Sequence, residues 1–76
     1  MDLSKLMVGE KVRLKGFSDP EISLKLIELG FVPGVELTYI RKAPFGDPIV
    51  VMCSGALISL RKAEAKTVIV ESIESI

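Results

Sequence analysis

Five short apolar segments, tight turns between most of them and one helix inserted after the first segment predict a mainly β fold. The expected architecture is a small, partly open barrel of the SH3-like type with about five strands. A split α+β sheet is the competing architecture. The chain has 76 residues, which permits one domain spanning 1–76, and 49% of its residues are hydrophobic. We therefore expect a single small domain with a dense aliphatic core.

Sequence pattern and capping residues predict the first strand and the helix. Residues 11–17 alternate apolar and charged side chains, as a half-buried strand does. Ser18 and Glu21 have the spacing of a capping box, in which each side chain accepts a hydrogen bond from the other residue's backbone N–H. Gly30 can adopt the left-handed conformation that ends a helix. We expect the helix at about 19–29.

This helix is predicted to have one apolar face. With about 100° between successive residues, Ile22, Leu26 and Leu29 cluster on the face that packs on the core. Ile27 lies at the border of that face. Leu24 falls on the opposite side, among charged neighbours, where an apolar residue is either a scattered surface leucine or a contact point.

Four more strands are expected, at 35–42, 48–53, 56–60 and 67–73. Prolines and a glycine within 44–48 predict a tight turn between the first two of them. Ser54 and Gly55 predict a two-residue hairpin loop. A short helical turn is expected at 63–66, before the last strand.

Composition excludes most chemistry. The chain has no His, the commonest general base and metal ligand, and we expect its single cysteine, Cys53, to be a small buried hydrophobe. Ten basic residues balance ten acidic ones, which speaks against binding to nucleic acid. No apolar run approaches the roughly 20 residues that cross a bilayer. We expect a cytosolic protein that is not an enzyme, has no cofactor or metal site and does not insert into a membrane.

Two apolar side chains indicate a surface for another protein. Phe45 is predicted at the tip of the 44–48 turn, where folding does not require a large ring, and Leu24 is predicted on the outer side of the helix. Each also has a plain structural explanation. Phe45 can fold back over its own hairpin, and single exposed leucines are common. The sequence leaves both interpretations open.

Three blocks of sequence, at 28–34, 43–48 and 59–65, resemble the ferrous iron transport protein A (FeoA) family in their order and spacing. The residues at 7–10 also resemble that family's opening turn. The matching positions that we expect to act as scaffold are Gly30, Phe31, Pro33, Gly34, Pro44, Gly46, Asp47, Pro48, Leu60 and Arg61. Of these, Arg61 is expected to hold the last turn by pairing with Asp47 or Glu64.

The resemblance implies a cytoplasmic accessory protein of ferrous iron transport. Such a protein acts by contact with the membrane permease FeoB, without binding iron itself, and FeoB recruits it to the inner face of the membrane. FeoB has a cytosolic GTP-binding domain and a membrane pore. The residues that we expect to contact this partner are Leu24, Lys25, Glu28 and Phe45. An open barrel edge and zero net charge also permit weak self-association into a homo-oligomer.

Two alternative functions stay open. The same barrel resembles the carboxyl-terminal domain of iron-dependent repressors, which would make the chain a regulatory domain. Alternatively, the protein would activate the GTPase of the permease by inserting an arginine, a device that raises such rates by about 10³–10⁵. The candidates are Arg13, Arg41 and Arg61, all of them predicted in or beside strands rather than on a projecting loop.

Overall fold

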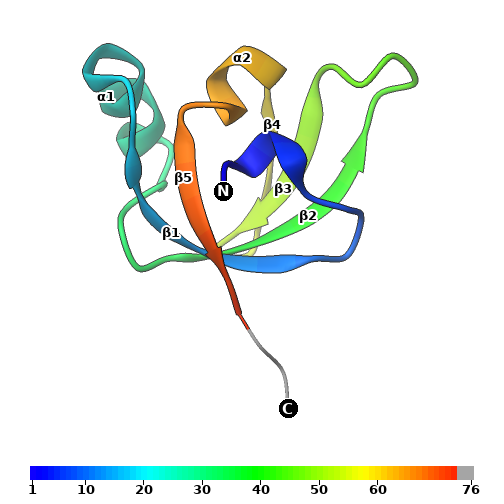
Figure 1. The fold of residues 1–76 in the computed structure, drawn as a ribbon, viewed down its shortest axis with the longest axis horizontal. Helices are drawn as coiled ribbons and strands as arrows, with labels where there is room; N and C mark the ends of the chain where they lie inside the picture. The colour runs from blue at the N-terminus through cyan, green and yellow to red at the C-terminus, as the bar shows by residue number, and fades with distance from the viewer. Residues whose placement is uncertain (74–76) are drawn as a thin grey trace.

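The computed structural model describes residues 1–73, and its elements follow the predicted order with one addition at the start. They are η1 (Leu3–Lys5), β1 (Lys11–Phe17), α1 (Pro20–Glu28), β2 (Glu36–Lys42), β3 (Ile49–Cys53), β4 (Ala56–Leu60), α2 (Lys62–Ala65) and β5 (Val68–Ser72). The strands form one antiparallel sheet in the order β4-β3-β2-β1-β5. β4 and β5 end this sheet without pairing to each other, so the curled sheet is a partly open barrel, as predicted (Figure 1).

Two irregularities bend the sheet around its core. The register between β1 and β5 shifts between Leu14 and Gly16, and the register between β2 and β3 shifts between Tyr39 and Arg41. Such bulges bend a strand and increase its twist, which lets a short sheet curl into a barrel. The enclosed core is mostly aliphatic and consists of Leu3, Leu6, Val12, Leu14, Leu26, Phe31, Leu37, Tyr39, Ile49, Val51, Cys53, Leu60, Ala65, Val68 and Val70. Cys53 is therefore buried, as expected.

The sequence did not predict η1, because a turn of three residues has no recognisable periodicity. The Asp2 carboxylate caps it by accepting from the backbone N–H of Ser4, at 2.9 Å. Leu3 and Leu6 are buried and extend the core beyond the sheet. The chain before η1 also meets β5, because the Val70 N–H donates to the Met1 carbonyl at 2.9 Å. This segment covers the outer edge of β5.

The predicted cap of α1 was wrong by one residue. Asp19, not Ser18, is the N-cap, and its Oδ1 accepts from the backbone N–H groups of Glu21 and Ile22 at 2.9 and 3.2 Å. Ser18 is still tied to the sheet side of the chain, because its own N–H donates to the Thr67 carbonyl at 2.9 Å. The helix therefore begins one residue later, with Pro20 in its first turn, where a missing N–H costs nothing.

The predicted apolar face of α1 was correct at its centre and wrong at its end. Leu26 is fully buried and Ile22 is half-buried against the core, but Leu29 is 45% exposed. The helix ends in a Schellman motif, in which Gly30 has φ +102° and the Phe31 N–H donates to the Leu26 carbonyl. This reversal of the chain puts Phe31 into the core, where it is fully buried.

Both predicted hairpin turns are present. Ser54 and Gly55 have φ of 51° and 82°, the left-handed pair that a type I′ loop requires. In the loop between β2 and β3, the Gly46 N–H donates to the Ala43 carbonyl, and the Ala43 N–H donates to the Pro48 carbonyl. The Asp47–Pro48 peptide bond is cis. These contacts close the loop on itself and leave Phe45 at its tip.

Candidate functional site

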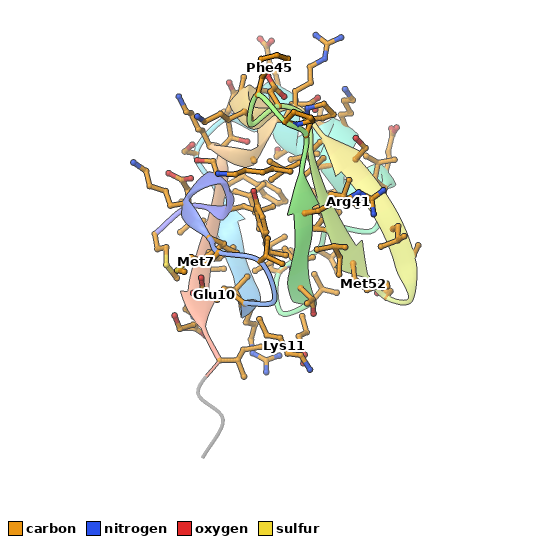
Figure 2. The ribbon with its side chains drawn as sticks, turned by 90° about the vertical axis from the view of Figure 1, so that its right-hand side faces the viewer. Met7, Glu10, Lys11, Arg41, Phe45 and Met52 are labelled. Atoms are coloured by element: carbon orange, nitrogen blue, oxygen red, sulfur yellow. The ribbon has the colours of Figure 1, made fainter. Side chains whose placement is uncertain are left out.

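The helices α1 and α2 and the β2–β3 loop lie at the same end of the barrel, with α2 between the other two (Figure 1). This end has two strongly exposed apolar side chains, Leu24 on α1 and Phe45 on the loop, which are 68% and 98% exposed. Phe45 lies at the extremity of the molecule (Figure 2). Its ring does not fold back over the hairpin, so the structural explanation that the sequence left open for Phe45 does not apply.

The outer face of α1 is more apolar than predicted. Ile27, expected at the border of the buried face, is 42% exposed. It follows Leu24 by three residues, a spacing that places two helical side chains next to each other. Glu28 follows Leu24 by four residues and is exposed as well. The spacing of Leu24 and Ile27 was readable in the sequence, but a border position on a helical wheel does not decide between burial and exposure.

Lys25 has an intramolecular partner. Its Nζ lies 2.6 Å from Oε2 of Glu64 on α2, and the Glu64 side chain is only 14% exposed. The other carboxylate oxygen of Glu64 accepts from the backbone N–H of Arg61 at 3.0 Å. Glu64 therefore joins α1 to the start of α2. Lys25, predicted as a partner contact, is 63% exposed along its side chain and forms this ion pair within the chain.

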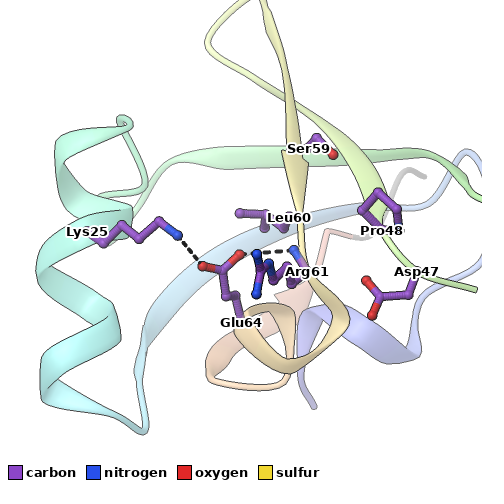
Figure 3. Close-up of a pocket in the computed structure, with 7 residues that line it drawn as sticks. All are labelled: Lys25, Asp47, Pro48, Ser59, Leu60, Arg61 and Glu64. Carbon is purple, nitrogen blue, oxygen red and sulfur yellow. Dashed lines mark hydrogen bonds and ion pairs between the residues drawn. The ribbon is translucent and has the colours of Figure 1, made fainter.

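A depression of about 570 Å³ opens between these elements (Figure 3). It is lined by Lys25, Asp47, Pro48, Ser59, Leu60, Arg61 and Glu64. The carboxylates here hold backbone groups, since Asp47 accepts from the Lys62 N–H at 2.9 Å and Glu64 accepts from the Arg61 N–H. Within residues 1–73, the expected ion pair of the Arg61 side chain with either carboxylate is not formed.

The contacts of Glu64 make the stability of this end depend on pH. The hydrogen bond from the Lys25 ammonium, and after it the one from the Arg61 backbone N–H, lowers the pKa of Glu64 from its ordinary value of 4.5. A carboxyl group whose pKa is lower in the folded chain than in the unfolded chain stabilises the fold above the unfolded pKa. That stabilisation is lost as the pH falls through the folded pKa.

We expect Glu64→Gln to lower the thermal midpoint by a few degrees near pH 7, because the ion pair is lost while the side-chain oxygen can still accept from Arg61. The difference from the wild type should shrink below about pH 4.5 and vanish in stronger acid. Thermal unfolding of both proteins from about pH 7 to about pH 3 checks this. Glu36→Gln, at an exposed position on β2, is the matched control. Parallel pH profiles for the wild type and Glu64→Gln would contradict the account.

The remaining residues singled out from the sequence lie mostly in turns and core. Phe31 and Leu60 are buried, and Gly30, Gly34 and Gly46 have the positive φ values that disfavour other residues. Pro33 is exposed directly before Gly34, Pro44 is exposed two residues before Gly46, and Pro48 follows Asp47 at the end of the β2–β3 loop. These positions shape the chain around the exposed side chains.

The three arginines considered for insertion into a GTPase lie in or next to strands. Arg13 is on β1, and its Nη1 donates to the Gly34 carbonyl at 3.0 Å. Arg41 is exposed on β2, and Arg61 directly follows β4. None of them extends from the β2–β3 loop that carries Phe45.

The described part of the chain offers neither a cluster of metal ligands nor a membrane-spanning helix. Within residues 1–73, no three His, Cys, Asp or Glu side chains come close enough together to hold a metal ion. No helix in the same range is long and apolar enough to cross a membrane. What the end of the barrel does present is exposed apolar area beside paired charges, which is suited to protein contact.

Among solved structures, the fold is shared with FeoA proteins. The chain is 34% identical to the FeoA-like protein of Clostridium acetobutylicum, with a TM-score of 0.91 over 100% of this chain and 90% of that chain. It is 33% identical to Stenotrophomonas maltophilia FeoA, solved with zinc and described as an SH3 domain protein. That comparison has a TM-score of 0.80 and covers 93% of this chain and 89% of that chain. The predicted SH3-like fold is confirmed.

The predicted likeness to repressors is a likeness of fold. A manganese-dependent transcriptional repressor superimposes with a TM-score of 0.85 over 96% of this chain and 41% of that chain, at 19% identity. At an identity this low the comparison shows a shared fold and does not show a shared regulatory function.

Two further comparisons concern the sequence itself. The chain is 33% identical over 78 residues to the Fe(2+) transport protein A/Fe(2+) transporter FeoB fusion protein of Porphyromonas gingivalis. That match covers 99% of this chain and 9% of the fusion protein, so the chain spans less than a tenth of that relative. The family model of the FeoA domain matches residues 1–72. The resemblance noted in the sequence is thereby confirmed, and the chain belongs to the FeoA domain family.

Proposed function

We propose that this protein is an accessory factor of ferrous iron uptake that acts by direct contact with the permease FeoB. The observation that carries the proposal is the fusion protein of P. gingivalis, whose name joins a transport protein A part and a FeoB part in one chain. Fusing two modules gives each a high effective concentration near the other, which favours pairs that work in contact.

The contact surface that we propose is the outer face of α1 together with the tip of the β2–β3 loop. Leu24, Ile27 and Phe45 supply its apolar area, with Lys25 and Glu28 as charged neighbours. Complete burial of a leucine or phenylalanine side chain contributes about 1.5–3 kcal/mol. Leu24 and Phe45 together therefore supply about 3–6 kcal/mol before the costs of association are subtracted.

The exposure of Phe45 supports a role in contact rather than in folding. A phenylalanine that is 98% exposed has almost no contact with its own chain, so the fold gains little from its ring. Aromatic side chains are enriched in the energetic centres of protein interfaces. Binding to FeoB would cover the ring and would recruit this protein to the inner face of the membrane.

The proposal is tested by the rate of ferrous iron uptake. Cells that express FeoB from the same organism should take up radioactive Fe(II) more slowly without this protein than with it. A variant with an exposed apolar side chain changed elsewhere, Met7→Asp, should restore uptake as well as the wild type does (Figure 2). Equal uptake with and without the protein, at equal amounts of FeoB, would overturn the proposal.

A further inference from the structure

The two edge strands of the sheet, β5 and β4, differ in how well they are protected against pairing with another strand. The outer edge of β5 is covered, because the Val70 N–H donates to the Met1 carbonyl and Asp2 forms an isolated bridge with Ile69. β5 also carries the charged Glu71, whose Oε2 lies 3.7 Å from Nζ of Lys15. A covered edge and a charge on the strand are two devices by which proteins prevent the addition of another strand.

The outer edge of β4 is neither covered by another segment of residues 1–73 nor protected by a charged residue. The strand contains no charged residue and no proline. Apart from its ladder with β3, no backbone hydrogen bond of Leu57 or Ser59 is formed within residues 1–73. β4 lies at the margin of the molecule, with nothing beside it on the outer side (Figure 2). An edge of this kind is a template for a further strand.

The hairpin geometry determines which groups the edge offers. In a two-residue type I′ hairpin the residues that flank the loop, Cys53 and Ala56, exchange hydrogen bonds. Bonded and non-bonded pairs alternate along an antiparallel ladder, so Ile58 also bonds to β3. The backbone N–H and C=O groups of Leu57 and Ser59 therefore point outward. Each copy offers two donors and two acceptors.

We infer that this edge binds the same strand of a second copy, through antiparallel pairing of β4 with β4 about a two-fold axis at Ile58. In this register Leu57 of one copy lies opposite Ser59 of the other, and all four outward donors find an acceptor. A shift of the axis to Leu57 would place Ser59 opposite Gly55, which lies in the hairpin loop and cannot continue the ladder. The inference is independent of the proposed contact with FeoB.

Side chains and charge fit a second copy. Leu57 is 56% exposed and lies opposite the half-buried Met52 on the outer face of the sheet. The two Leu57 side chains would be diagonal neighbours on that face, within reach of each other. The formal net charge of the chain is zero, so two copies approach without long-range repulsion. Because the edge is short, the pairing is weak and forms at high micromolar to millimolar concentration.

Amide hydrogen exchange measured by NMR at low and high protein concentration tests the register directly. At low concentration the Leu57 and Ser59 amides should exchange fast and the Ile58 amide slowly. At high concentration the Leu57 and Ser59 amides should become protected, while the Ile58 amide changes little. Concentration-dependent protection elsewhere, with Leu57 and Ser59 still exchanging fast, would overturn the inference.

Sedimentation equilibrium of two variants tests the same edge independently. Leu57→Lys places like charges beside each other across the axis, and Ser59→Pro removes an outward N–H without touching the ladder to β3. Each substitution should raise the dissociation constant of the dimer about tenfold or more. Met7→Lys, the matched control at a side chain that is 76% exposed, should self-associate like the wild type. A wild type that stays monomeric at millimolar concentration, or variants that associate as strongly as it does, would refute the pairing.

Discussion

Leu24→Asp is expected to abolish measurable binding to FeoB while the fold and its stability stay close to those of the wild type. Leu24 is 68% exposed on the outer face of α1, so the substitution removes little contact within the chain. In a complex, the same change would remove an apolar contact and bury a carboxylate without a partner. The first loss is about 1.5–3 kcal/mol and the second adds to it, so affinity should fall by about 100-fold or more.

The control for this prediction is a substitution of the same kind at another exposed apolar residue. Met7→Asp changes a side chain that is 76% exposed and lies away from Phe45, and it should bind FeoB like the wild type (Figure 2). Phe45→Ala should weaken binding as well, because it removes the most exposed ring of the proposed surface. Unchanged affinity in both Leu24→Asp and Phe45→Ala would show that FeoB contacts a different face.

Leu26→Ala is expected to have the largest effect on stability. Leu26 is fully buried, although it lies only two residues from the exposed Leu24. Replacing a buried leucine by alanine costs about 2–5 kcal/mol, since it removes apolar contacts and leaves a cavity. A domain of 76 residues has a total stability of about 4–11 kcal/mol. The substitution should therefore remove a large part of it.

Chemical denaturation checks this prediction. The midpoint for Leu26→Ala should fall strongly, whereas Leu24→Ala on the same helix should shift the free energy of unfolding by about 0.5 kcal/mol or less. The comparison holds helix propensity constant, because both variants replace leucine by alanine inside one helix. Equal destabilisation by the two substitutions would contradict the assigned orientation of α1.

The sequence was sufficient to predict most of the fold. Alternation along β1, the Ser54-Gly55 loop and the glycine after α1 are local signals, and local interactions decide those features. The errors arose where distant residues decide the outcome. Asp19 caps α1 while the Ser18 N–H bonds to the distant Thr67, and Leu29 is exposed where the Schellman motif turns the chain so that Phe31 is buried. η1 depends on its packing against α2 and β5 and has no periodic pattern of its own.

The candidate site was predicted in part. The exposure of Leu24 follows from helical periodicity, whereas the sequence could not decide whether Phe45 folds back on its hairpin. The ion pair of Lys25 with Glu64 joins residues 39 positions apart, so it depends on how α1 and α2 lie in the fold. The expected ion pair of the Arg61 side chain was wrong, and both candidate carboxylates accept from backbone N–H groups, Glu64 from Arg61 and Asp47 from Lys62.

A calorimetric titration of this protein into full-length FeoB from the same organism, held in detergent, measures the proposed contact itself. We expect saturable binding of the wild type and of Met7→Asp, and no measurable heat of binding for Leu24→Asp. Repeating the titration with the cytosolic GTP-binding domain alone would locate the contact within FeoB. No saturable binding of the wild type to the full-length permease would contradict the account.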